Sequence, residues 1–169
     1  MKRLLCLALL LLTLAACAPR LDSPAKLAES LHKALRTDRH KAFAACCLRE
    51  ADITFLDNKI RVSRSDNPDD YAPLSDLSPD LPDMFSLMFG AIRAEVGSIN
   101  WKNVELMGFD EGEEVLSAWV PPGVRLLDSL TLNLSDGQQN ISLRFYDVVR
   151  TQRGWLVSNT LYRLQVESP

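Results

Sequence analysis

Tyr146 and Asp147 are the adjacent side chains of this 169-residue chain that could carry out acid–base chemistry. Consecutive strand residues face opposite sides of a sheet, so the two cannot enter one cavity unless a bulge intervenes. If Phe145 faces inward, Asp147 does too. A carboxyl group in an apolar hollow has a raised pKa and can act as a general base. The interpretation that we favour is a solvated Asp, or one paired with a nearby arginine. The arginines within reach along the sequence are Arg144, Arg150 and Arg163.

The remaining residue types give little sign of catalysis. The two histidines, His32 and His40, precede the predicted sheet, and we expect both to be solvated. The chain offers no Ser-His-Asp set, no glycine-rich phosphate loop and no His or Cys at metal-ligand spacing. We therefore expect a protein that is not an enzyme and that uses no cofactor and no metal.

The strongest chemical signal lies at the N-terminus, where a cysteine ends an apolar run. Lys2 and Arg3 precede residues 4–14, which are apolar except for Thr13. About 11 residues are too few for a membrane-spanning helix, which needs roughly 20. A basic start, a short apolar run and small residues before a cleavage point are typical of a secretory signal peptide.

The stretch Leu14-Ala15-Ala16-Cys17 resembles the lipobox of bacterial prolipoproteins. The resemblance implies a diacylglyceryl group on the Cys17 thiol, cleavage before this residue and acylation of the new amino terminus. Two or three acyl chains would hold the protein durably on a membrane. In that family an Asp after the Cys usually signals retention in the inner membrane. Here Ala18 follows, so we expect the periplasmic face of the outer membrane of a diderm bacterium.

The sequence divides into a signal peptide (1–16), a lipidated tether (17–22) and a single domain (23–166). Removal of the signal peptide, which holds two basic residues, leaves 17 basic and 22 acidic residues and a net charge of −5. No basic cluster exceeds a few residues, so we expect no nucleic-acid partner. No later segment is long and apolar enough to span a membrane.

Cys46 and Cys47 would remain as the thiols of the mature domain. Neighbouring Cα atoms lie about 3.8 Å apart, below the usual disulfide range of about 4.4–6.8 Å. A vicinal disulfide would therefore need a strained peptide. We favour two thiols on a helix, at least one of them buried as a small apolar side chain. A vicinal disulfide and an intermolecular bridge are the alternatives.

Helices are predicted mainly in the first part of the chain. A serine N-cap followed by a proline begins an amphipathic helix over 24–36. A second, short helix should follow Asp38 and end near Arg49. Residues 52–56 are predicted as a strand, and 83–96 as the most apolar helix.

Residues 57–82 combine six aspartates with several prolines and are predicted as one long loop. A calcium site is one interpretation of such a segment. The spacing lacks the alternating acidic pattern and the closing Glu of a calcium loop, so we favour a solvated loop.

From residue 99 onward apolar residues alternate with a period of two, which predicts an antiparallel meander. Turns are expected at Asp110-Glu111-Gly112, at Asp136-Gly137 and at Gln152-Arg153-Gly154, and a bulge near Lys102-Asn103. The predicted strands are 99–109, 114–120, 130–134, 141–149 and 155–164.

This order of elements predicts an α+β fold, in which a curved antiparallel sheet of about five strands is packed by three helices into a cone. The order resembles the nuclear-transport-factor-2-like superfamily, also described as a cystatin-like α+β cone. Within residues 142–164, Gly154-Trp155 after a long strand is typical of its small members. The superfamily includes enzymes, small-molecule binders and interaction modules. Its enzymes use an Asp or His inside the cone, often with a Tyr.

The helix over 83–96 has apolar side chains around most of its circumference, so it should be covered on more than one side. We expect it to be core, although a hollow beside it would fit a small apolar ligand. The residues that would line such a hollow are Met84, Met88, Phe89, Trp101, Trp119, Phe145 and Asp147. We predict a non-enzymatic binding module for an envelope protein partner or a small apolar ligand. The alternative is a cone-fold carrier, or an isomerase- or cyclase-like enzyme that uses Asp147.

Overall fold

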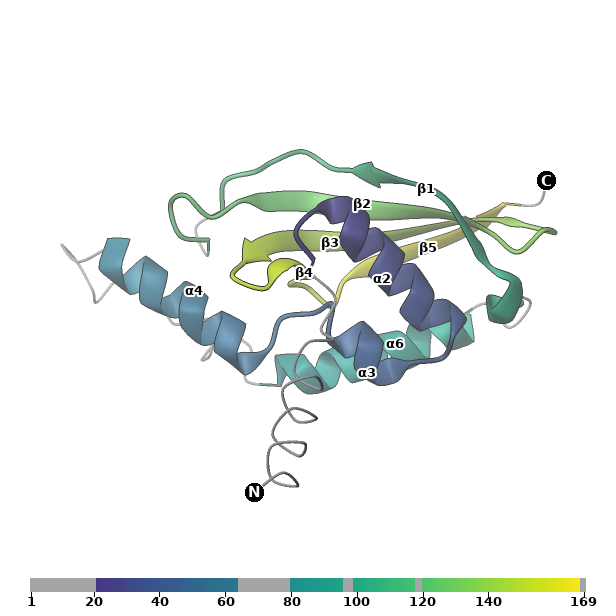
Figure 1. Ribbon diagram of the computed structural model, residues 1–169, viewed down its shortest axis with the longest axis horizontal. Coiled ribbons are helices and arrows are strands. Elements are labelled where there is room, and N and C mark those ends of the chain that lie inside the picture. The colour runs from purple at the N-terminus through teal and green to yellow at the C-terminus, as the bar shows by residue number, and fades with distance from the viewer. Residues whose placement is uncertain (1–20, 64–79, 96–98, 118–119, 168–169) are drawn as a thin grey trace, which may run out of the picture.

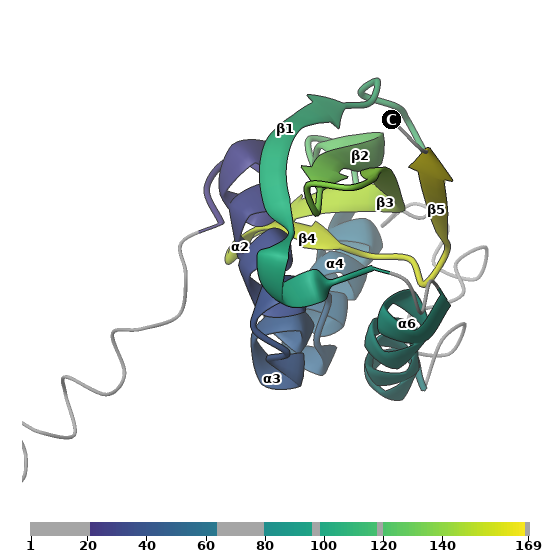
Figure 2. The same ribbon diagram turned by 90° about the vertical axis from the view of Figure 1, so that its right-hand side faces the viewer.

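A curved antiparallel sheet, with helices gathered beneath its curve, forms the folded part of the chain (Figures 1 and 2). The structure is a computed structural model that describes residues 21–63, 80–95, 99–117 and 120–167. None of the helices in these ranges is long and apolar enough to cross a membrane. The predicted fold class, α+β with a curved antiparallel sheet packed by helices, is confirmed.

The first predicted helix forms as expected. Helix α2 spans Pro24–Arg36, and the Ser23 side chain accepts a hydrogen bond from the backbone N–H of Lys26. This N-cap satisfies one of the backbone donors that have no partner within the helix. Leucines at every fourth position are fully buried against the sheet. They are Leu27, Leu31 and Leu35.

The second helix is shorter than predicted. Helix α3 spans only His40–Ala44, so Cys46 and Cys47 lie beyond its end rather than on it. Cys47 instead forms an isolated parallel bridge with Val157.

The prediction of a strand over 52–56 is wrong, because these residues belong to helix α4, Glu50–Ser63. Ile53, Leu56 and Ile60 are buried at helical spacing, and the Asp52 carboxylate accepts a hydrogen bond from the backbone N–H of Arg49 at the start of the helix. The predicted loop over 57–82 is therefore helical at its start, and its end is the start of helix α6, Leu81–Glu95. The aspartates of the calcium interpretation between residues 64 and 79 lie outside the described residues.

The predicted strand over 99–109 is split. Its first half is a turn of 3₁₀ helix, η2 (Trp101–Asn103), and its second half begins strand β1, Glu105–Glu111. The register shift lies between Leu106 and Gly108 rather than at Lys102-Asn103.

The partner of β1 is not the segment 114–120. In its described residues that segment makes a single bridge, from Glu114 to Leu127. Strand β2, Leu126–Ser135, takes its place, so the connection after Gly112 is much longer than the hairpin that was predicted.

Strand β3, Asn140–Thr151, is the centre of the sheet. On one side it pairs with β2, and on the other its two halves pair with different strands. Its first half pairs with β5 (Tyr162–Glu167) and its second half with β4 (Gly154–Val157). The single last strand predicted over 155–164 is thus two strands, whereas the turns at Asp136-Gly137 and Gln152-Arg153 are confirmed.

The core lies between the helices and the inner face of the sheet. Phe43 of α3 is central to it, with its ring centroid 5.2 Å from that of Phe89 on α6 and 6.1 Å from that of Phe145 on β3. All three side chains are buried. The three elements are therefore held together by aromatic packing.

Candidate functional site

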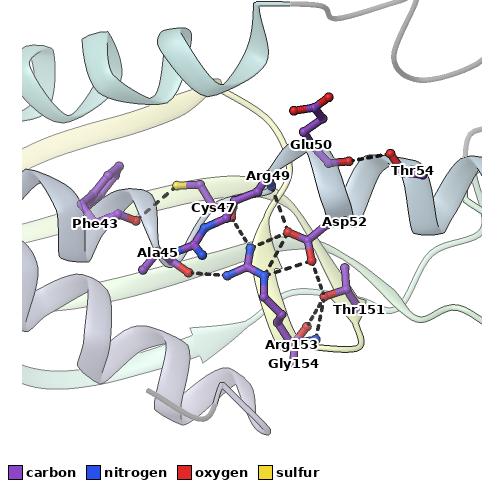
Figure 3. Close-up of polar contacts among 10 residues, drawn as sticks. All are labelled: Phe43, Ala45, Cys47, Arg49, Glu50, Asp52, Thr54, Thr151, Arg153 and Gly154. Carbon is purple, nitrogen blue, oxygen red and sulfur yellow. Dashed lines mark hydrogen bonds and ion pairs between the residues drawn. The ribbon is translucent and has the colours of Figure 1, made fainter. Parts of the chain in front are cut away.

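A buried ion pair fixes one end of the sheet to the helices. Asp52, at the start of α4, is 5% exposed, and Arg153, in the β3–β4 turn, donates from Nε to both of its carboxylate oxygens at 3.0 Å. Arg153 also donates from Nη1 to the carbonyl of Ala45 at 3.0 Å and from Nη2 to that of Cys47 at 2.8 Å. Figure 3 shows the guanidinium group between the carboxylate and these two carbonyls. One side chain thereby joins three separate segments.

The Asp52 carboxylate has further partners in addition to Arg153. The hydroxyl of Thr151 donates to its Oδ1 at 3.4 Å, and the backbone N–H of Arg49 donates to its Oδ2 at 3.0 Å. Both carboxylate oxygens accept hydrogen bonds. The Asp52 carboxylate therefore stabilises the fold rather than serving as an acid or base.

A pocket of about 250 Å³ opens beside this joint, between α4 and the ends of β2 and β3. Its walls come from three parts of the chain. The Asp52–Arg153 pair joins α4 to the end of β3. The backbone N–H of Arg150 donates to the carbonyl of Arg125, which joins the third part. The residues that line it are Phe55, Lys59, Gly123, Val124, Arg125, Arg150, Thr151 and Gln152. We call it the basic pocket, because three of these residues are cationic and none is acidic.

The cations of the basic pocket are held in part by aromatic rings. The Lys59 ammonium lies 5.3 Å from the centroid of the Phe55 ring, and the Arg125 guanidinium lies 5.2 Å from that of Trp155. Such cation–π contacts orient a long side chain without neutralising it. Arg125 also pairs with Glu114 at 2.9 Å, and both side chains are about half exposed. The three cations and Glu114 together carry an excess of two positive charges.

This arrangement can bind an anion that carries an apolar part. Arg and Lys side chains suit phosphate and carboxylate oxygens, while Phe55 and Val124 supply apolar contact. Sequence reasoning missed this pocket, because its cations come from three distant segments. Lys59 falls in the segment that the sequence predicts to be a loop, and the sequence suggests Arg150 only as a partner for Asp147.

Asp147 lies where β3 changes partner, and it has a positive φ of 54°. Its Oδ2 accepts a hydrogen bond from the Asn159 side-chain amide at 2.8 Å, and its carbonyl accepts one from the backbone N–H of Ser158. Asp tolerates this left-handed conformation better than most residues. The break in alternation ties the carboxylate to the β4–β5 connection, and no arginine among the described residues pairs with it.

The other predicted lining residues are divided among several places. Phe145 and Phe89 are buried around Phe43, and Met88 is buried on α6, whereas Met84 is 44% exposed. Trp101 is buried on η2, where the Arg93 guanidinium lies 5.9 Å from its ring. Trp119 lies outside the described residues. The structure thus brings together Phe89 and Phe145, and the Arg93 guanidinium lies 5.9 Å from the rings of both Phe89 and Trp101. Asp147 lies elsewhere, at the β4–β5 connection.

The histidines differ from each other. His40 is exposed, and its ring meets the Phe89 ring edge-on at 5.6 Å. The expectation that His32 is solvated is wrong, because it is half-buried and its Nε2 lies 2.9 Å from the carbonyl oxygen of Val104. It joins α2 to the start of β1.

Cys46 and Cys47 are free and buried, as in the favoured interpretation, and no vicinal disulfide forms. Burial raises the pKa of Cys46 to about 12 and raises that of Cys47 well above its usual value. Within the described ranges, no three His, Cys, Asp or Glu side chains converge as metal ligands would.

Comparison with known proteins identifies the fold of the chain and nothing beyond the fold. The sequence matches no family model and no curated protein. Among solved structures, the chain resembles a cystatin-like protein from Ruminococcus gnavus ATCC 29149, with a TM-score of 0.56 and 13% sequence identity. The match covers 83% of this chain and 44% of that protein, so the chain spans less than half of its length. The described domain thus has a cystatin-like α+β fold.

Proposed function

We propose that the protein is a bacterial envelope lipoprotein, anchored through lipid on Cys17, whose cystatin-like domain is a non-enzymatic binding module. The sequence Leu14-Ala15-Ala16-Cys17 carries this proposal. The position of the fold supports it, because Leu21 is already buried and bridged to Gly154. The folded domain therefore starts four residues after the lipid acceptor, with the periplasmic face of the outer membrane as the proposed location.

The geometry of the polar residues favours binding over catalysis. The Asp147 carboxylate is bonded to Asn159, and the Asp52 carboxylate is bonded to Arg153. The basic pocket, by contrast, combines cations with apolar walls. Exposed apolar side chains on α6, Met84 and Leu87, offer a further surface to an envelope protein partner or a small apolar ligand.

The anchor can be tested with Cys17→Ser in cells of a diderm bacterium. We expect this variant to lose the diacylglyceryl mass and to leave the membrane fraction, because a hydroxyl group cannot accept the lipid in place of the thiol. Cys6→Ser is the matched control, since it makes the same change inside the proposed signal peptide. It should stay in the membrane fraction. Unchanged membrane association of Cys17→Ser would refute the anchor.

A further inference from the structure

We propose that the basic pocket contacts phosphate groups of anionic lipids in the same membrane that holds the anchor. The inference rests on the proposed lipid attachment and adds to it a defined orientation of the domain. Three features carry it: the reach of the chain before Leu21, the position of the pocket, and its charge.

The reach is short. The carbonyl of Leu21 accepts a hydrogen bond from the backbone N–H of Trp155 at 2.6 Å, which fixes this residue to strand β4. Cys17 lies four residues earlier. Four residues span at most about 14 Å when fully extended. A lipid on Cys17 therefore holds this part of the domain close to the membrane surface.

The basic pocket lies at the same end of the molecule. Gly154 bridges Leu21 on one side and pairs with Thr151 of β3 on the other. Neighbouring strands lie about 4.8 Å apart, so the backbone of Thr151, in the pocket wall, is roughly 10 Å from that of Leu21. The β2–β3 turn lies at the far end of β3 in Figure 1, up to roughly 36 Å from the pocket end, since each strand residue adds at most about 3.3 Å.

The charge suits an anionic surface. The mature chain carries a net charge of −5 in the proposed form, so such a surface repels it as a whole. Lys59, Arg125 and Arg150 nevertheless place positive side chains in the pocket near the anchor, and Lys59 and Arg150 form no ion pair among the described residues. Each Lys or Arg near an anionic leaflet strengthens association roughly fivefold. Phe55 and Val124 in the same pocket can meet the apolar part of the lipid below its phosphate.

The test uses the lipidated protein in vesicles, with a fluorophore at one of two cysteines introduced singly. Asn58→Cys sits beside Lys59 on α4, and Gln138→Cys sits in the β2–β3 turn. Both native side chains are exposed, uncharged amides outside the pocket lining. Buried Cys46 and Cys47, with raised pKa values, should not take the label. A nitroxide on the lipid head group then reports proximity by quenching.

In phosphatidylglycerol vesicles, quenching at Asn58→Cys should be several times that at Gln138→Cys, and this ratio should fall in phosphatidylcholine vesicles. The double change Lys59→Gln and Arg150→Gln should lower the ratio in phosphatidylglycerol to the phosphatidylcholine level. Arg163→Gln, which removes one exposed arginine on β5, is the control for losing a positive charge away from the pocket and should leave the ratio unchanged.

Equal quenching at the two positions, or no response to the double change, would overturn the proposal. This failure is distinct from failure of the anchor, because the lipidated protein would still float with the vesicles. Calorimetric titration with inorganic phosphate in neutral detergent micelles separates the two possible phosphate sources. Binding there that is lost on Lys59→Gln would assign the pocket to a free anion and overturn the lipid contact.

Discussion

At the scale of single residues, Arg153 is the side chain on which most local structure depends. It binds a carboxylate and two backbone carbonyls, and its carboxylate partner Asp52 is almost fully buried. Removing one member of such a pair leaves the other charge buried without a partner, and this lowers the free energy of unfolding strongly. Replacing both members with apolar side chains would lower it much less.

We therefore expect Arg153→Met to lower the free energy of unfolding by about 3 kcal/mol. This is the lower end of the range for a broken buried pair, because Arg153 is itself partly exposed. Urea unfolding measures the change. The same substitution at exposed Arg163 should cost no more than about 0.5 kcal/mol. Similar losses for the two variants would contradict a structural role for the Asp52–Arg153 pair.

The two thiols provide a second test at this scale. At pH 8 a thiol with a pKa of 9 is about one-tenth ionised, whereas one with a pKa of 12 is ionised about once in 10⁴ molecules. We expect Cys46 in the native domain to react with a thiol reagent roughly a thousandfold more slowly than an ordinary cysteine. In denaturant, mass analysis after alkylation should find both Cys46 and Cys47 modified. Rapid modification of the folded protein would contradict the burial.

The same shift makes stability depend on alkaline pH. The folded state holds the Cys46 proton up to a pKa of about 12, and the unfolded state loses it near 9. The contribution of the Cys46 thiol to the free energy of unfolding is therefore fully present below pH 9. It is lost as the pH rises from 9 toward 12, because the unfolded state ionises first. Cys46→Ala should therefore reduce the decline in unfolding free energy above pH 9. An unaltered slope, measured by urea unfolding at several pH values, would count against the shift.

At the scale of elements, the β3–β4 hairpin joins the sheet to the start of the domain. Gly154 has a positive φ of 108°, and a Cβ atom there would lie 2.0 Å from the carbonyl oxygen of Leu21. Only glycine combines this conformation with so close an approach. The hairpin therefore contacts Leu21 directly through its backbone, and the Trp155 N–H donates a hydrogen bond to the Leu21 carbonyl.

Gly154→Ala should be more destabilising than Gly137→Ala. Gly137 also has a positive φ, 87°, but a Cβ atom there meets nothing within 4 Å. The control variant thus isolates the conformational cost of about 1–2 kcal/mol, and the excess at Gly154 measures the contact with Leu21. Thermal unfolding of both variants supplies the comparison. Equal losses would show that Leu21 contributes little.

Several elements could be predicted because local signals agree with tertiary packing. The helix over 24–36 has a serine cap and leucines every fourth residue, and the turn at Asp136-Gly137 has a typical hairpin sequence. The segment 52–56 misled because Ile53, Phe55 and their neighbours fit a short strand as well as a helix. Only the burial of Ile60 one turn further on shows the helical period.

The site was harder to predict than the fold. Lys59, Arg125 and Arg150 are far apart in sequence, and no spacing relates them. Strict alternation places Asp147 on the inner face if Phe145 lies there, and one residue at positive φ interrupts that alternation. Both features depend on tertiary structure rather than on any short pattern.

At the scale of the whole molecule, the contacts that close the fold join its beginning to its end. Leu21 and Cys47 bridge strand β4, and Asp52 binds Arg153, which lies 101 positions later. The residues that cover the edge of β4 are thus made early, and the strand they cover is made near the end of synthesis. Contacts of this length slow folding, because a long loop must close first. Because the chain is synthesised from its N-terminus, the domain cannot complete its fold until the last strands have been made. If the chain is exported across a membrane as proposed, such late closure would keep it unfolded until its last strands have been made.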